Sequence, residues 1–149
     1  MLSIDEHVNG NSITISEKAD TGIMSFLAST NIVAFVCTRD PAHAKAFYGD
    51  TLGLRLVSED PFAVVFDANG ILLRVSIFPE LKPAPFTVLG WSVPDIGAAV
   101  KDLEKAGVKF ERIPGLPQDE IGVWTTPDGS KVAWFKDPDG NTLSISQHE

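Results

Sequence analysis

Four side chains of this 149-residue sequence carry an imidazole or a thiol, groups that bind metals or attack substrates: His7, His43, His148 and Cys37. Their placement argues against both uses. A single cysteine excludes an intramolecular disulfide and any zinc site built on two or four cysteines. The histidines fall in a polar N-terminal stretch, in the first turn of a predicted helix, and beside the last residue. We therefore expect three solvated histidines and one small, unreactive cysteine.

Arg74 is the candidate with the clearest chemistry, because it interrupts a predicted apolar strand at residues 71–78. A guanidinium is permanently charged, and a partly buried one needs an anion beside it. One interpretation is that Arg74 pairs with a carboxylate, phosphate or enolate of a ligand, in a bidentate geometry. The alternatives are a structural ion pair with Glu59, Asp119 or Glu120, and a guanidinium that reaches solvent.

Two tryptophans and one loop are further candidates. Trp124 and Trp134 lie on consecutive predicted strands, where one or both could stack on an aromatic ligand or pack in the core. Residues 116–120 are interpreted either as a lid, in which Gln118, Asp119 and Glu120 reach a ligand, or as a surface loop.

The elements that position these residues follow from the hydrophobic pattern. Residues 31–36 are a short apolar run with β-branched and aromatic side chains, which predicts a buried strand. Asp40 followed by Pro41 predicts a helix start, and Gly53 predicts its left-handed end. Asn69-Gly70 predicts a tight hairpin turn. Further strands are predicted at 54–58, 63–67 and 71–78.

After a proline-rich linker at 79–85, a similar pattern begins again. A strand is predicted at 86–93, and Asp95 is expected to cap a helix at 96–106 that ends before Gly107. The remaining strands are predicted at 108–113, 122–126, 132–136 and 141–146.

The repeated pattern indicates an internal duplication. Residues 67–75 match residues 137–145 at an offset of 70, and residues 31–36 are placed over residues 88–93 at an offset of 57. We predict an α+β fold of two tandem βαβββ modules, at 31–79 and 86–147, whose mixed sheets pack around a cleft. Together they form a single domain at 29–149.

Residues 1–28 stand apart as an N-terminal arm with four acids and one lysine. One interpretation is a flexible segment, with Met24 as a second plausible start of translation. The other is that the arm contains a short strand at 12–16, where Ile13 and Ile15 alternate with polar residues.

Three motifs mark element boundaries: FY and LGL within 47–54, PDI at 94–96 and FKDPDGN at 135–141. Together they resemble the vicinal oxygen chelate superfamily, which includes glyoxalase I, extradiol dioxygenases, methylmalonyl-CoA epimerase and the bleomycin and fosfomycin resistance proteins. The resemblance covers about residues 30–147 and implies a glyoxalase/bleomycin resistance/dioxygenase-like fold. Asp137 and Asn141 are expected to bond backbone groups of their own turn.

The metal-using members of that superfamily carry one ligand near the start of the first strand and one on the last strand of each module. Carried onto this sequence, these positions are Asn31, Arg74, Val88 and Ser144. Imidazole, thiolate and carboxylate ligands are absent from them, and a guanidinium repels a divalent ion. The resemblance therefore implies that the usual metal site is missing. We predict no cofactor, the alternative being a divalent metal at other positions.

Side chains alternate between the two faces of a strand, so every second residue is assigned to the cleft. Gly90 is predicted to leave room there for a ligand, whereas Trp91 is expected to point at the helix. The predicted substrate-binding set combines hydroxyls, apolar groups, an amide and one guanidinium. It consists of Asn31, Phe35, Arg74, Ser76, Val88, Ser92, Trp124 and Ser144.

Composition limits the partners. The net charge of −8 argues against nucleic acids and anionic membranes, which attract basic surfaces. Neither a run of about 18 apolar residues nor a signal peptide is apparent, so we expect a cytoplasmic protein.

Three functions remain. The first is metal-independent small-molecule binding, of the resistance or sequestration type, in a cleft that contains Arg74. The second is a lyase, isomerase or dioxygenase acting on a small, anionic substrate, for which the sequence identifies no catalytic residue. The third is a regulatory or partner-binding domain. The resemblance also implies a homodimer.

Overall fold

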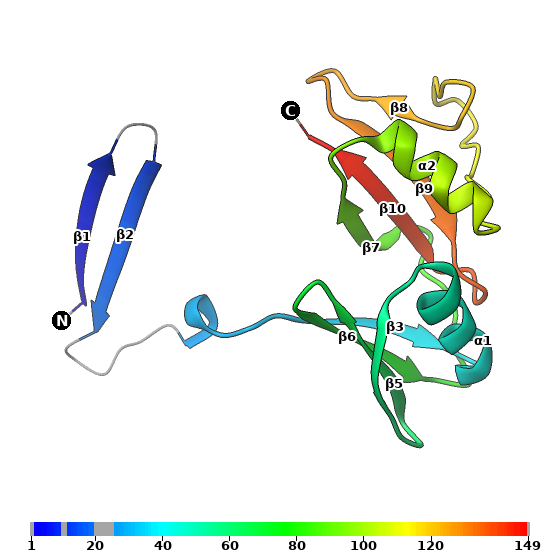
Figure 1. The fold of residues 1–149 in the computed structure, drawn as a ribbon, viewed down its shortest axis with the longest axis horizontal. Helices are drawn as coiled ribbons and strands as arrows, with labels where there is room; N and C mark the ends of the chain where they lie inside the picture. The colour runs from blue at the N-terminus through cyan, green and yellow to red at the C-terminus, as the bar shows by residue number, and fades with distance from the viewer. Residues whose placement is uncertain (1, 10–11, 20–25, 149) are drawn as a thin grey trace. The chain divides into compact units, whose positions relative to one another are not determined.

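The computed structural model describes residues 2–9, 12–19 and 26–148. The chain divides into two compact units, Met1–Ile32 and Val33–Glu149. In the first unit, β1 (Leu2–Asn9) pairs with β2 (Ser12–Ala19) in an antiparallel hairpin, and a short 3₁₀ helix, η1 (Phe26–Ser29), follows (Figure 1). The strand predicted at 12–16 therefore exists as part of β2.

The second unit begins with one βαβββ module. Its four strands form a mixed sheet in the order β3-β6-β5-β4, in which β3 and β6 are parallel. The helix α1 passes directly into a π-helical turn, η2. The elements are β3 (Val33–Thr38), α1 (Pro41–Lys45), η2 (Ala46–Thr51), β4 (Arg55–Glu59), β5 (Ala63–Ala68) and β6 (Ile71–Ile77).

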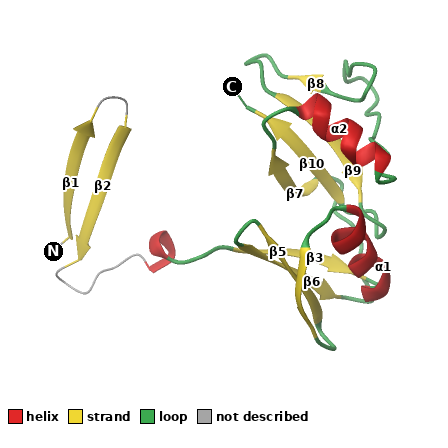
Figure 2. Cartoon of the chain, viewed as in Figure 1, coloured by secondary structure: helices red, strands yellow, loops and turns green. Residues whose placement is uncertain are grey.

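The second module repeats this arrangement in the order β7-β10-β9-β8, with β7 and β10 parallel. Each helix contacts its own sheet: α1 lies against β5 and β6, and α2 against β9 and β10 (Figure 2). The predicted α+β fold of two βαβββ modules is thereby confirmed. The elements are β7 (Thr87–Ser92), α2 (Ile96–Lys105), β8 (Trp124–Thr125), β9 (Lys131–Lys136) and β10 (Thr142–Gln147).

Local signals for turns and caps are confirmed. Asp40 Oδ1 accepts hydrogen bonds from the backbone N–H groups of Ala42 and His43 at the start of α1, and Asp95 caps α2 in the same way. Asn69 and Gly70 have φ values of 52° and 88°, as a tight hairpin turn requires.

The strand predicted at 108–113 is wrong. Only an isolated bridge between Phe110 and Phe135 forms there. The Gln118 side chain takes the place of a strand partner, because its Oε1 accepts from Ile113 N at 2.7 Å and its Nε2 donates to Glu111 O at 2.9 Å. Gln118 therefore holds the backbone of its own loop, which fits a surface loop better than a lid.

One hydrophobic core joins the helix-covered faces of both sheets. Its largest fully buried side chains include Tyr48 and Phe66 of the first module and Phe135 and Leu143 of the second. Phe47 lies between the modules, with its ring centroid 5.2 Å from that of Tyr48 and 6.4 Å from that of Phe135. The modules therefore fold as one unit around shared aromatic contacts.

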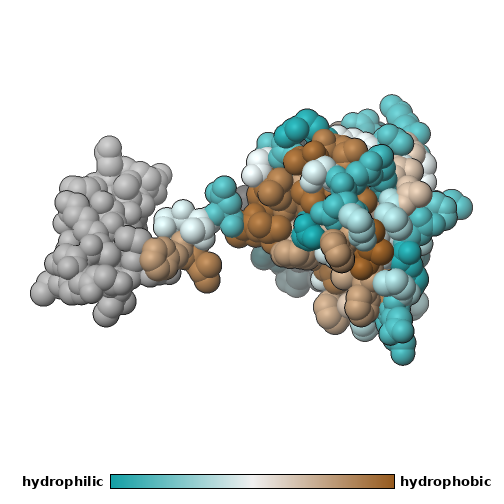
Figure 3. All heavy atoms as spheres, turned by 90° about the horizontal axis from the view of Figure 1, so that it is seen from below, coloured by the Kyte–Doolittle hydropathy of each residue, from teal (hydrophilic) through white to brown (hydrophobic). Residues whose placement is uncertain are grey.

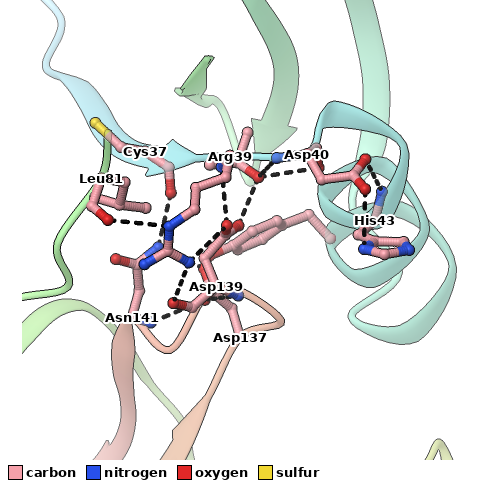
Figure 4. A network of polar contacts seen from close by, with 10 residues as sticks. Cys37, Arg39, Asp40, His43, Leu81, Asp137, Asp139 and Asn141 are labelled. Carbon is pink, nitrogen blue, oxygen red and sulfur yellow. Dashed lines mark hydrogen bonds and ion pairs between the residues drawn. The ribbon is translucent and has the colours of Figure 1, made fainter. Parts of the chain in front are cut away.

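A turn of the second module bonds the end of β3 and the following residue, Arg39 (Figure 4). Asp137 Oδ1 accepts hydrogen bonds from the backbone N–H groups of Asp139 and Asn141, both at 2.9 Å. The predicted role of Asp137 inside its own turn is thus confirmed. In addition, its Oδ2 accepts a 2.7 Å bond from the hydroxyl of Tyr48, which links the two modules.

The other two polar residues of this turn bind β3 directly. Asp139 accepts from Thr38 Oγ1 at 2.5 Å and from the backbone N–H of Arg39 at 2.8 Å. Asn141 Nδ2 donates to the carbonyl of Cys37 at 2.8 Å. We call residues 137–141 the clasp, because all three of its polar side chains bond groups of the first module.

Burial and the neighbouring carboxylate of Asp137 raise the pKa of the Tyr48 phenol far above its ordinary value. The hydroxyl consequently stays protonated and remains a donor to Asp137. We expect Tyr48→Phe to lower the free energy of unfolding by about 1.5–3 kcal/mol, because a buried carboxylate loses a hydrogen bond. Urea denaturation of the variant and the wild type measures this difference.

The same contact predicts a pH dependence. Since folding raises the tyrosine pKa, its contribution to stability is complete below about pH 10, the pKa of an unfolded tyrosine, and is lost as the pH rises further. Tyr48 is the only tyrosine of the chain, so Tyr48→Phe removes this dependence. If the free energies of unfolding of wild type and variant changed in parallel above about pH 10, the pH dependence could not be assigned to Tyr48.

Candidate functional site

Each of the two four-stranded sheets has one face on the core and one open face, and strand alternation decides which residues lie on which. Along β3, Val36 and Thr38 are buried, whereas Phe35 lies on the opposite face and is 58% exposed. Along β6, Leu73 and Val75 are buried, and their even-numbered neighbours are not. The open face of the first sheet thus carries Val33, Phe35, Cys37, Leu72, Arg74 and Ser76.

Arg74 lies at the centre of this open face. In the cross-strand register it is opposite Phe35 of β3 on one side and Val65 of β5 on the other, and Ser76 follows on the same face. Leu72, the preceding residue on this face, is 43% exposed. A half-buried cation is therefore surrounded mainly by apolar side chains.

The structural ion pairs considered for Arg74 do not form among residues 26–148. Glu59 pairs instead with Lys45 at 3.1 Å, and Asp119 Oδ1 accepts from the backbone of Ile121 and Val123. Neither carboxylate neutralises the guanidinium.

Asp60 is the acid that Arg74 influences. Its carboxylate accepts hydrogen bonds from Phe62 N at 2.7 Å and Ala63 N at 3.0 Å. These bonds, chiefly the one from Phe62, lower the pKa of Asp60, and the charge of Arg74 lowers it further. Asp60 is thus engaged by its own turn, and Arg74 remains available to another anion.

The open face of the second sheet is rich in hydroxyls and carries a tryptophan pair. Trp124 of β8 and Trp134 of β9 stack on each other, with ring centroids 6.2 Å apart and planes 26° apart. Trp134 Nε1 donates to Thr87 Oγ1 at 3.1 Å, which fixes the ring. Val88, Ser92 and Ser144 lie on the same face, through the pairing of β10 with β7 and β9.

His148 continues this face beyond β10 and is held by two serines. Its Nε2 lies 3.1 Å from Ser146 Oγ and its Nδ1 lies 3.3 Å from Ser130 Oγ. The side chain is exposed, as predicted, yet both ring nitrogens have partners. Sequence alone did not reveal these contacts, because Ser130 is brought to His148 by the pairing of β9 with β10.

Gly90 does not leave room for a ligand. A Cβ atom at this position would lie 2.6 Å from Ser144 Oγ, because β10 places Ser144 directly across from Gly90. The space above the glycine is therefore filled by the Ser144 side chain.

The predicted equivalence of Asn31 with Val88 is wrong by two residues. The helix caps Asp40 and Asp95 are 55 positions apart in the sequence. Phe35, which pairs with Arg74, and Gly90, which pairs with Ser144, are also 55 positions apart. Val33 is therefore the true counterpart of Val88. Asn31 precedes β3 and belongs to the first unit. The apolar Ile32 suggested an earlier strand start, yet it is 71% exposed.

The sequence matches the Glyoxalase/Bleomycin resistance protein/Dioxygenase superfamily over residues 27–145. The protein belongs to this superfamily. It is 33% identical over 133 residues to the uncharacterised protein YaeR of Escherichia coli (strain K12), a match that covers 80% of this chain and 95% of that protein.

Solved structures share the fold at lower identity. Lactoylglutathione lyase from Agrobacterium tumefaciens matches with a TM-score of 0.63 and 19% identity, over 80% of this chain and 93% of that chain. A bleomycin-binding protein complexed with bleomycin matches with a TM-score of 0.61 and 22% identity, over 80% and 99% of the two chains. No helix in the described part of the chain is long and apolar enough to cross a bilayer.

The metal-ligand positions of the superfamily do not fit a divalent ion in this chain. With the corrected register they are Val33, Arg74, Val88 and Ser144, which offer two hydrocarbons, a cation and a hydroxyl. Within residues 2–9, 12–19 and 26–148, no three histidine, cysteine, aspartate or glutamate side chains form a group that could hold a metal. The donor chemistry of these positions suits hydrogen bonding to a ligand rather than metal coordination.

The close approach of Gly90 and Ser144 gives a testable coupling. We expect Gly90→Ala to cost about 1–3 kcal/mol, because the new methyl group forces the serine hydroxyl away. In a Ser144→Ala background, where no hydroxyl stands above Gly90, the same change should cost clearly less. A double-mutant cycle by urea denaturation measures the coupling, and additive effects would contradict the geometry.

Proposed function

We propose that the protein binds a small organic anion on the open face of the β3-β6-β5-β4 sheet, with Arg74 as the anchor and no metal. The observation that carries this proposal is a half-buried guanidinium without an ion pair among residues 26–148. A guanidinium presents a planar fork of donors that matches a carboxylate or phosphate. A ligand anion would supply the direct ion pair that Asp60, which is bonded to the backbone of its own turn, does not form.

The surroundings of Arg74 suggest the rest of the ligand. Phe35 and Leu72 are exposed at 58% and 43% and flank the guanidinium on the same face. Burying such apolar surface favours a ligand whose anionic group is attached to an apolar or aromatic body. The bleomycin-binding protein with this fold supports small-molecule binding as the function.

We further propose a homodimer. Val33, Phe35, Leu72 and Val88 on the open faces are exposed, as is Phe86 directly before β7. Figure 3 shows apolar side chains spread over one side of this unit. A second copy would cover such surface and enclose the ligand. Sedimentation equilibrium tests this, and we expect Phe35→Asp to shift the protein toward monomer, whereas a wild-type monomer at micromolar concentration would contradict the proposal.

The single cysteine, which cannot form a disulfide within the chain, fits a reducing cytoplasm.

The anchor role of Arg74 predicts a loss of affinity. We expect Arg74→Gln to weaken binding of aromatic carboxylates or phosphate monoesters at least about tenfold, because a charge-assisted hydrogen bond is lost. Arg55→Gln is the matched control, since Arg55 is an exposed arginine of the same sheet that already pairs with Asp67. A thermal-shift screen finds the ligands, and calorimetry measures their affinities. Equal losses in the two variants would point to the overall charge rather than to an anchor.

Removal of metals tests the second half of the proposal. We expect dialysis against a chelator to leave ligand binding unchanged, because the corrected ligand positions lack metal-binding side chains. Elemental mass spectrometry of the same samples reports any bound ion. Stoichiometric zinc, iron, nickel or manganese that leaves together with ligand affinity would overturn metal independence.

A further inference from the structure

A cavity of about 300 Å³ lies between the two modules, on the helix-covered side of the second sheet. Its wall consists mainly of residues whose side chains pack toward the shared core, together with Ser92 at the end of β7, and Arg74 does not line it. Six apolar residues that form most of the wall are Leu52, Leu54, Trp91, Ala99, Leu103 and Phe135. Its volume is at the lower end of the range for ligand pockets, which fits a single ring with a short substituent.

One charged side chain lines this cavity. Asp102 lies on α2, on the same side of the helix as Ala99 and Leu103, and it is exposed. Among residues 26–148 it forms no ion pair. The second module (residues 86–147) also has nine acidic residues against six lysines and arginines, so its surroundings are negative. An apolar chamber with an unpaired carboxylate at its rim is complementary to a hydrophobic cation.

We propose that this cavity binds a small hydrophobic cation, such as an arylalkylammonium ion. The ring would lie between the leucines and Trp91, where burial of apolar area stabilises the complex. The ammonium group would remain at the rim, beside Asp102, and keep part of its water. This site does not rest on the function proposed for Arg74, and the charge of its ligand is opposite.

The test uses 2-phenylethylammonium as the probe, with 2-phenylethanol as its neutral counterpart and 3-phenylpropionate as its anionic one. Titrations of the full-length protein are followed by the indole NMR signal of Trp91, assigned with Trp91→Phe. The cation should bind about threefold to fivefold more tightly than the alcohol, as a partly screened ion pair allows. The carboxylate should not perturb this signal.

Four variants separate the contributions to binding. Ala99→Leu should abolish binding by filling the chamber, and Asp102→Asn should reduce the affinity for the cation to that for the alcohol. Glu104→Gln is the matched control, because Glu104 is an acid of the same helix that does not line the cavity. Arg74→Gln should leave binding intact, so failure of the anion site and failure of this site are distinguishable.

Several results would overturn the proposal. One is equal affinity of wild type for the cation and the alcohol, and another is equal loss in Asp102→Asn and Glu104→Gln. Because Ala99→Leu alters a packed region, thermal denaturation is used to check that this variant folds. If Ala99→Leu is unfolded, the test rests on Asp102→Asn, which changes an exposed residue. Absence of binding in a wild-type dimer, together with a change of oligomeric state in Ala99→Leu, would assign the cavity to a second copy instead.

Discussion

The bond between Asp137 and Tyr48 is the contact on which the arrangement of the two modules depends. A carboxylate that is only 6% exposed needs partners for both oxygens, and its own turn supplies two backbone donors and the amide of Asn141. The phenol of Tyr48 supplies the remaining one from the other module. Because Tyr48 also lies in the shared aromatic core, the polar clasp and the hydrophobic contacts fix the same relative position of the modules.

Only the second module contributes a clasp, although the first module is built on the same pattern. Its counterpart in the first module is the turn after Asp67, in which Asn69 and Gly70 are exposed. The groups that receive the clasp, Thr38 and the N–H of Arg39, correspond at an offset of 55 to Val93 and Pro94, which provide neither a hydroxyl nor an N–H. The second module therefore holds the first without being held in return.

Much of this structure could be predicted from local sequence signals. The helix caps at Asp40 and Asp95, the Asn69-Gly70 turn and the repeated modules depend on neighbouring residues, and all were correct. The errors arose where distant residues decide. Gln118 replaces a strand partner of the segment at 108–113, Ser144 fills the space at Gly90, and the two-residue shift at Asn31 shows only once strands are paired. The stacking of Trp124 on Trp134 likewise needs the register of β8 and β9.

With the corrected register, the four positions at which metal-using members of the superfamily carry their ligands have a different chemistry in this chain. A divalent ion offers a ligand concentrated positive charge, and three or four protein donors are needed to hold it. Here two of the four positions are valines, and a third is Arg74, whose positive charge is part of the side chain itself. The valines offer no oxygen or nitrogen atom that could accept a hydrogen bond from the guanidinium. Ser144, the fourth position, lies against Gly90 on the other sheet. These positions therefore present one fixed cation and apolar surface in place of metal ligands. Under the proposed function, the cation would bind the anionic group of a ligand and the apolar surface would cover the rest of it.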